Sequence, residues 1–598
     1  MALTTPSVSP AIVVKEIDLT GVAPNVETSL SGMVGAFKWG PVDVPTRIEN
    51  EAKLAEVFGT PDTSRAVDYF SAAQYLRYSG NLIVNRQTSQ TAGADSAHNS
   101  YFGKNALSQE LHIGNEDQFE RSTFTSEDFM FVAKYPGAMG NSLKVSLLAT
   151  KSGDSAGSRA QTEAAFNSWS YKSDFDGAPG TSDWASKQIG SVSNDEVHVA
   201  IIDSDGLVSG TKGTVLETFP YVSVALGAKT EDGGDNYIKT VLNNGSNYVW
   251  FGEFGGDSVI INGTNWGSAP SGSVTDYADG VTYSSEDSAE ASLSGGADGA
   301  ALAVADYQLG FDNFEDKDEI DVQILIAPGL ANADDQVTIV NDLVGIAGTT
   351  RKDCVVVTSP DRAAVVNNIN PVTDTITTTD RFTGSNYLIV DNNYLRVYDK
   401  YNDNYIYIPA ASTTAGLMAA TDANFGPWYS PAGERRGLYT GVTNLAYSPS
   451  KAERDTLYKA GVNPIVQFAG RGIILFGDKT KQSRPSAFDR INVRRLFLAL
   501  EKSISLAARN FMFEFNDDFT RSEFVAIVEP LLREIQARRG IEDFFVQCDE
   551  RNNTPEVVAR NELVASIFIK PAYSINFITL NFVAVRGGID FEEVIGTV

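Results

Sequence analysis

The fold of this 598-residue chain is decided by residues 322 to 360, VQILIAPGLANADDQVTIVNDLVGIAGTTRKDCVVVTSP. Two short apolar runs, at 322 to 329 and 354 to 360, enclose a longer segment, 334 to 348, that is typical of a helix. Continuous apolar runs of this length are typical of strands buried on both faces of a sheet. The stretch therefore predicts strand, helix and strand in a central sheet that is covered on both sides.

The same alternation of strands and helices occurs between residues 32 and 86. Strands are predicted at SGMVGAFKWGP and NLIVNRQ, and helices at NEAKLAEVFG and RAVDYFSAAQYLRYS. In the longer helix Val67, Phe70, Ala73 and Leu76 recur at helical spacing, which predicts one buried face.

Between these two regions the pattern changes to short β-like runs, such as SLKVSLLAT, VHVAIID and NYVWFGEF, separated by clusters of Gly, Ser, Asp and Asn. We therefore predict a multidomain protein with an α/β body, residues 23 to 90 and 301 to 380, interrupted by a β-rich outer insertion at 91 to 300. A hairpin at YLRVYDKYNDNYIYIPAAS and a helix near TTAGLMAATDANF are expected after residue 381.

The last fifth of the chain predicts an α+β domain. Two helices are expected in it. The second should begin at Thr520, where Glu523 has capping-box spacing, and end at Gly540. Two long strands, ELVASIFIK and SINFITLNFVAV, follow. The first helix is basic, begins in PSAFDRINVRRLF, and carries an apolar stripe about five turns long: Val493, Leu496, Phe497, Leu500, Ile504, Ala507, Ala508 and Phe511.

The composition is that of folded protein, 42% hydrophobic and 21% charged, with a formal net charge of -29. The acidic excess lies before residue 471, because residues 471 to 598 hold 17 Lys and Arg against 18 Asp and Glu. An acidic body argues against nucleic-acid binding. No basic leader precedes an apolar segment, and no apolar run reaches the roughly 20 residues that span a bilayer. We expect no export signal and no direct membrane insertion, and we expect Cys354 and Cys548 to be free buried thiols.

No catalytic, cofactor-binding or metal site is expected. The segment GDSAG, residues 153 to 157, matches the nucleophile pattern of serine hydrolases, but Ser155 would need a histidine base and a carboxylate, and only His198 lies downstream. SGTKGT at 209 to 214 lacks the glycine spacing of a phosphate loop. The Asp-x-Asp-Gly segments at 174 to 177 and 203 to 206 match only the start of a calcium loop, and Asp-Gly turns explain them.

Both ends of the chain carry isolated strand-like segments. PAIVVKEIDL occupies residues 10 to 19, and IDFEEVIGTV occupies 589 to 598 after two glycines. A lone terminal strand completes its hydrogen bonds by joining a sheet, its own or a neighbour's. A heterologous contact of this kind that does not close on itself produces a helical polymer. These features indicate a protein that assembles.

The chain also carries long matches, in the same order, to one protein family. They include SPAIVVKE, GAFKWGP, VFGTP, RKDCVVVTSP, YDKYND, SPAGERRG, GDKT with PSAFDRINVRRLF, and NNTPEVVARNELVASIFIKPAYSINFITLNFVA. In these segments the chain resembles the tail sheath protein of T-even-type contractile-tailed bacteriophages. An extra outer domain carried by longer members would be absent or vestigial here.

The resemblance implies a virion protein, assembled in the host cytoplasm, that forms stacked six-membered rings around a tail tube. Contraction of these rings would drive the tube through the host envelope for genome ejection. The implied partners are further copies of the chain in a six-fold helical assembly, the tail tube protein, and the baseplate and tail terminator or neck proteins.

The resemblance also implies where the assembly surfaces lie. Segments 1 to 22 and 589 to 598 would be arms that add strands to neighbouring subunits, and 381 to 588 would be the inner domain facing the tube. Candidate arm residues are Ile12, Val14, Glu16, Ile589, Phe591 and Val594. A receiving hairpin at about 562 to 585 would present Ile567, Ile569, Ile575, Phe577, Thr579 and Asn581. Candidate tube-facing residues, on and beside the helix at 488 to 510, are Arg490, Arg494, Arg495, Glu501, Lys502 and Arg509.

Several alternatives stay open at this point. The chain could form the sheath of a phage-derived, bacteriocin-like injection system, or it could be a static surface or capsid-type protein. A hydrolase that uses Ser155 is the alternative from a different class. For the basic helix, the alternative is that Arg494 and Arg495 pair internally with carboxylates or only solvate the helix.

Overall fold

A computed structural model describes residues 28–89, 96–102, 111–122, 129–149, 156–187, 195–225, 227–252 and 288–575. The chain divides into two compact units. In the part described, the main unit holds the residues up to Asn424 together with Pro431–Ile491. The C-terminal unit holds Phe425–Ser430 and the residues from Asn492 onward.

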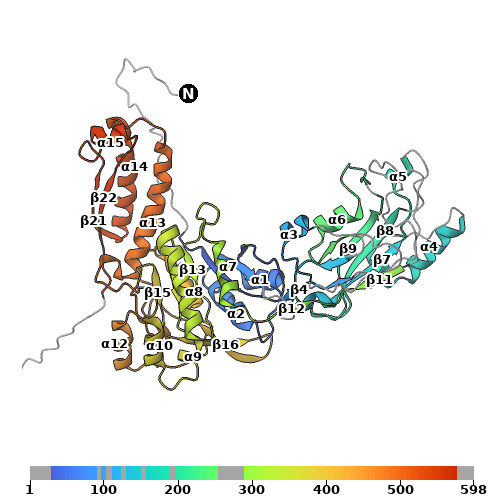
Figure 1. Cartoon of the computed structure of the whole chain (residues 1–598), viewed down its shortest axis with the longest axis horizontal. Helices are drawn as coiled ribbons and strands as arrows, with labels where there is room; N and C mark the ends of the chain where they lie inside the picture. The colour runs from blue at the N-terminus through green and yellow to red at the C-terminus, as the bar shows by residue number, and fades with distance from the viewer. Residues whose placement is uncertain are drawn as a thin grey trace, which may run out of the picture. The chain divides into compact units, whose positions relative to one another are not determined.

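The centre of the main unit is a six-stranded sheet in the order β15-β14-β13-β1-β3-β2 (Figure 1). All neighbouring strands are parallel except β2, which pairs antiparallel with β3 at one edge. Every residue of β3, β13, β14 and β15 is buried, so the predicted sheet covered on both faces is confirmed. The strands are β1 Ser31–Ala36, β2 Thr46–Ile48, β3 Leu82–Gln87, β13 Ile324–Ile326, β14 Val355–Thr358 and β15 Leu388–Val390.

Asparagine caps fix the start of two helices of this unit. The side-chain oxygens of Asn50 and Asn332 accept hydrogen bonds from the backbone N–H groups of Lys53 and Asp335, at 2.8 and 3.0 Å. The helices are α1 Glu51–Phe58, α2 Ala66–Leu76, α7 Val304–Asp312, α8 Ala333–Gly345 with a π-helical continuation Ile346–Arg351, α9 Arg362–Val365, α10 Pro371–Thr379 and α11 Ala411–Asn424.

Residues 381 to 491 belong to the main unit, apart from Phe425–Ser430. We expected the C-terminal domain to begin at residue 381, but β15 pairs with β14 inside the central sheet, so the compact C-terminal unit begins near residue 492. The predicted hairpin is present as β16 and β17. The elements here are β16 Tyr394–Asp399, β17 Asn404–Pro409, β18 Asn444–Leu445, α12 Lys451–Lys459, β19 Ile465–Phe468, β20 Gly472–Leu475 and the 3-10 turn Ala487–Asp489.

Helix α2 differs from the prediction of a single buried face. Eight of its eleven residues are buried, including the polar residues Ser71, Gln74 and Tyr75. The helix packs against β1 and β3 and also against α11, β16 and β17, so it has no side open to solvent along most of its length. Two of these polar side chains bond to backbone carbonyls: Tyr75 donates to the Ser29 carbonyl at 2.7 Å, and Ser71 donates to the Val67 carbonyl at 2.7 Å.

The insertion between β3 and α7 is β-rich, as predicted. It contains a four-stranded antiparallel sheet in the order β11-β7-β8-β9, a three-stranded sheet β10-β6-β5 and the pair β12-β4. The strands are β4 Ala97–His98, β5 Tyr101–Phe102, β6 Phe131–Ala133, β7 Leu143–Ala149, β8 Glu196–Asp203, β9 Thr214–Ser223, β10 Val249–Phe251, β11 Ser288–Ser292 and β12 Ala297–Asp298. The helical segments are α3 Glu116–Arg121, α4 Ala156–Ser168, α5 Asp183–Lys187, α6 Ile238–Gly245 and the 3-10 turns Ala138–Ser142 and Lys172–Asp174.

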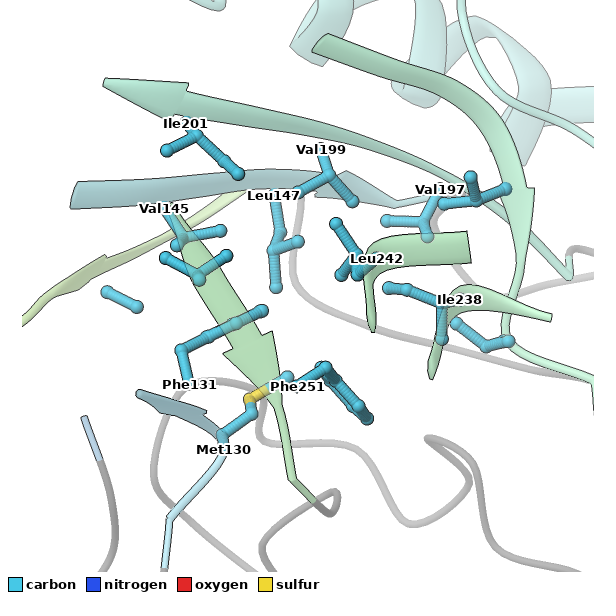
Figure 2. Close-up of a cluster of buried hydrophobic side chains, with 14 of the residues drawn as sticks. Met130, Phe131, Val145, Leu147, Val197, Val199, Ile201, Ile238, Leu242 and Phe251 are labelled. Atoms are coloured by element: carbon cyan, nitrogen blue, oxygen red, sulfur yellow. The ribbon is translucent and has the colours of Figure 1, made fainter. Parts of the chain in front are cut away.

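The insertion has a hydrophobic core of its own. Figure 2 shows side chains from β7 and β8, such as Leu147 and Val199, lying across from Leu242 of α6 and Phe251 of β10. All four are buried, which explains why a segment with so many polar loops still folds compactly.

In the C-terminal unit, α13 (Ile491–Ala508) and α14 (Asp518–Ala537) lie side by side, with β21 (Ile541–Gln547) and β22 (Ser566–Pro571) packed along them (Figure 1). A 3-10 turn, Arg509–Phe511, ends α13, and α15 spans Pro555–Ala559. The predicted stripe forms the core of this unit. Its buried members meet Phe524, Val528 and Leu532 of α14.

The ends of α14 differ from the predicted ones. The helix begins at Asp518, two residues before the expected start, because the Asp517 side chain accepts the backbone N–H of Thr520 at 2.8 Å. It ends with Arg539 in the left-handed region, at φ 66°, while the N–H groups of Arg539 and Gly540 bond the carbonyls of Gln536 and Ile535. Gly540 is needed for close packing, since a Cβ there would lie 2.6 Å from Ile535 Cγ2.

Candidate assembly surfaces

The sheet of the C-terminal unit pairs β22 with β21, a strand that we did not predict. In the register Val546 lies opposite Ile567 and Phe544 lies opposite Ile569. Ile567 and Ile569 pack against the helical core, so their side chains hold the sheet to its own unit. The sheet can therefore bind a partner strand through the main-chain hydrogen-bonding groups at its edge.

The remaining residues of the predicted strand-exchange system have different outcomes. Ile575 is described and is exposed just beyond β22. The other nine lie outside the residues that the structure describes: Ile12, Val14, Glu16, Phe577, Thr579, Asn581, Ile589, Phe591 and Val594.

The outer face of the same sheet carries an aromatic pair that our sequence reasoning missed. Phe545 and Phe568 lie opposite each other in the register, are both exposed, and have ring centroids 6.2 Å apart in a stacked arrangement. A signal was present, because SIFIK places apolar residues on both faces of a strand rather than on one.

The basic helix does not present the surface that we predicted. Arg494 and Arg495 are only 4% and 5% exposed, and they lie in a run of six buried residues from Ile491 to Leu496. Arg494 Nη2 lies 3.2 Å from Glu501 Oε2, two turns further along the helix. The prediction that both arginines face outward is therefore wrong, and internal pairing is confirmed for Arg494. The first turns of α13 are buried all round, which the apolar stripe alone did not reveal.

Arg490 precedes α13 and is paired inside the main unit. Its Nη1 lies 2.9 Å from Asp478 Oδ1 and contacts the Tyr458 hydroxyl, and its Nε lies 3.5 Å from Asp489. Burial acts to lower the pKa of Arg490, but Tyr458 and Asp478 outweigh it and raise that pKa. The charge of Arg490 is thus largely neutralised by ion pairs within the subunit.

The later turns of the helix keep the accessible charges. Glu501 and Arg509 are exposed and Lys502 is half-buried. Partial burial raises the pKa of Glu501, and the Arg494 guanidinium opposes that change. These three residues carry mixed charge, so the accessible part of α13 is not the basic surface expected from the sequence.

The histidine required by the hydrolase alternative is already engaged. Ser155 lies outside the described residues, but His198 is buried on β8. Its Nδ1 accepts the backbone N–H of Tyr221 at 3.1 Å, and its Nε2 donates to the Gly177 carbonyl at 2.7 Å. Burial lowers the pKa of His198, which keeps the ring neutral. With both ring nitrogens bonded to main chain, His198 cannot act as a general base for a serine.

The calcium-like segment at residue 203 is a closed turn. Asp203 accepts hydrogen bonds from Ser142 Oγ and from the backbone N–H groups of residues 206 to 209. Burial alone would raise the pKa of Asp203, but these donors lower it. Its oxygens are thus committed to the loop, as the turn interpretation predicted.

The described part of the chain contains no group of three or more His, Cys, Asp or Glu residues placed to hold a metal ion. None of its helices combines the length and the apolar character that a membrane crossing requires. Cys354 and Cys548 are free and buried, as predicted.

Comparison with known proteins identifies the class first. Models of the phage tail sheath protein central domain and the phage tail sheath C-terminal domain match residues 300–481 and 483–584. The chain is thus similar to structural proteins of phage tails. It is 32% identical to the tail sheath protein of Vibrio phage KVP40 and 30% identical to that of Enterobacteria phage T4, and each match covers 98% of this chain and 99% of the relative.

The chain belongs to the phage tail sheath family. It is a structural subunit of a contractile phage tail, a component of the virion and not an enzyme. The crystal structure of a sheath tail protein from Listeria innocua shares the fold, with a TM-score of 0.50 at 11% identity over 91% of this chain and 96% of that one. The hydrolase and capsid-type alternatives are therefore wrong.

Proposed function

We propose that copies of this chain polymerise as stacked six-membered rings around a tail tube, joined by strands exchanged between subunits. In this proposal residues 1 to 22 and 589 to 598 of one subunit add to the β21–β22 sheet of neighbours. The observation that carries it is the small sheet itself: among the described residues, β21 pairs with β22 alone. A strand held by main-chain hydrogen bonds tolerates rotation and sliding of the bodies that it links.

Contraction then requires no nucleotide. The extended sheath would be a polymer in a higher free-energy state, and its subunits would gain contact area as they rearrange and drive the tube through the host envelope. The further partners in this proposal are the tail tube protein, the baseplate and the tail terminator or neck proteins.

Deletion of the arms tests the strand links. We expect variants lacking residues 1 to 19 or 589 to 598 to stay folded and monomeric, with an unchanged melting transition, and to form no long tubes in electron micrographs. Tubes of normal length from either deletion would show that the arms do not link the subunits.

The tube contact is tested separately on the accessible turns of α13. We propose that Glu501, Lys502 and Arg509 face the tube. Charge reversal of Lys502 and Arg509 should weaken co-sedimentation with tail tubes and leave tube-free polymerisation intact. Charge reversal of Arg533, an exposed arginine of α14 that pairs with Glu529, is the matched control. Equal loss with this control would assign the effect to general electrostatics.

A further inference from the structure

The connection between α13 and α14 exposes a concentration of large apolar side chains. Met512, Phe513, Phe515 and Phe519 are 61%, 101%, 83% and 75% exposed within eight residues. We call residues 512 to 519 the aromatic tip. Soluble proteins seldom expose so many large apolar groups together unless the surface is covered by a partner.

The tip is held in place by hydrogen bonds to its own unit. Asn516 Nδ2 donates to the Glu562 carbonyl at 2.7 Å, and Asn516 Oδ1 accepts from Arg521 Nε at 2.7 Å. Asp517 caps α14. The aromatic side chains are thus displayed on a fixed connection.

The backbone conformation of Phe513 is further evidence that the exposed aromatic side chains serve a contact. It has φ 73°, in the left-handed region that costs free energy for a bulky residue, and the described residues do not bury its ring in compensation. A glycine would relieve this strain, so the phenylalanine at this position is explained by a contact that the described residues do not make.

A complementary patch lies on the main unit, around β19, β20 and α12. Phe468 and Phe476 form an edge-to-face pair with centroids 5.4 Å apart, and Arg454 lies over both rings at 5.6 and 5.7 Å. Phe476 is exposed, and so is Leu438, which forms an isolated β-bridge with Ile474 of β20. We call Leu438, Arg454, Phe468 and Phe476 the arginine-aromatic patch.

The segments that carry the two surfaces have net charges of opposite sign. Residues 510 to 519 hold three acidic residues and no basic one, whereas residues 451 to 484 hold seven Lys and Arg against three Asp and Glu in a chain of net charge -29. Two apolar surfaces with opposite charged rims favour each other over like-charged alternatives.

We propose that the aromatic tip of one subunit docks on the arginine-aromatic patch of a second copy of this chain. The proposal rests on the proposed function, because it adds a side-chain contact to a polymer of these subunits. Two different surfaces in contact form a heterologous interface, which repeats along an open helical assembly instead of closing in a dimer.

The substitution Phe513→Gly separates this contact from folding. Because glycine accepts φ 73°, the variant should keep or raise the melting temperature of the monomer. Loss of one buried phenylalanine should raise the critical concentration for tube formation about tenfold. The matched control is Arg539→Gly, which relieves a left-handed residue at φ 66° away from the tip and should leave assembly unchanged.

A charge exchange identifies the surface that receives the tip. Glu514→Arg and Arg454→Glu should each impair tube formation, and the double variant should restore it. Failure of the double variant to restore assembly would overturn the pairing. Normal tubes from Phe513→Gly would also overturn the pairing. So would an assembly defect that appears only when tail tubes are present. A defect traced to lost contact with the chain's own residues 1 to 27 would overturn it as well.

The arm deletions distinguish this inference from the proposed function. If the tip variants assemble normally while the arm deletions do not, only the inference fails. If the arm deletions assemble normally while the tip variants do not, the strand-exchange proposal fails and the tip contact stands.

Discussion

Replacing Asp391 with asparagine should remove a pH dependence from the stability of the main unit. Asp391 follows β15 and is fully buried. Its Oδ1 accepts from Ser359 Oγ at 2.8 Å and its Oδ2 accepts from Thr414 Oγ1 at 3.2 Å. Asparagine can keep both contacts, because its amide can donate to Thr414 Oγ1 while that hydroxyl donates to Tyr439, 2.8 Å away.

Burial raises the pKa of Asp391 from 3.8 to about 7. Between these two values the folded chain binds a proton that the unfolded chain has lost, so the stability of the main unit falls as the pH rises from about 4 to about 7. The full cost above pH 7 is about 4 kcal/mol. The asparagine variant has no carboxylate to bury and avoids this cost.

Calorimetry of wild type and Asp391→Asn from pH 4.5 to 8 measures the effect on the main unit's transition. The two melting temperatures should nearly coincide at pH 4.5, and the variant should become the more stable protein as the pH rises. Asp68, whose pKa burial raises to about 6, is present in both proteins and cancels in the difference. A stability difference that does not change with pH would refute the reasoning.

Three further substitutions or modifications test single features. Gly540→Ala should destabilise the C-terminal unit by about 1 to 3 kcal/mol, since a Cβ would also lie 2.9 Å from Trp428 Cγ, as urea unfolding followed by tryptophan fluorescence would show. Asp203→Asn should cost about 3 kcal/mol, because an amide cannot accept all of the loop's N–H groups, and faster amide exchange at residues 206 to 209 would report it. Burial raises the pKa of Cys354 to about 12, so iodoacetamide should leave this thiol unmodified at pH 8 until the main unit unfolds; rapid labelling of the native protein would contradict that.

The sequence predicted the central sheet well because its strands are buried on both faces. In runs such as CVVVTSP the side chains on both faces of the strand are apolar, so they are buried only inside a covered sheet. Composition alone therefore identifies these strands. α2 was harder to predict, since Ser71, Gln74 and Tyr75 look like a solvent face and are instead buried against neighbouring elements. Tertiary contacts decided what helical spacing could not.

The candidate surfaces were predicted less well for a related reason. β21 was missed because IEDFFVQ follows a helix after only three residues and has two acidic residues, Glu542 and Asp543, near its start. The buried positions of Arg494 and Arg495 could not be inferred from the apolar stripe, because the aliphatic part of an arginine side chain can pack next to a core although most arginines face solvent. The aromatic tip has no periodicity at all, so only its exposure in the folded chain reveals it.

The burial of these arginines changes the physical requirement on a tube contact. A row of outward arginines would bind an acidic tube strongly and would have to be pulled away from it during contraction. Glu501, Lys502 and Arg509 instead offer mixed charges, and exposed ion pairs contribute roughly 0 to 1 kcal/mol each and weaken with salt. If α13 does face the tube, its hold is the sum of a few weak contacts repeated on many subunits. Such a hold is firm for the whole sheath, yet each subunit can release it for little free energy when the lattice rearranges.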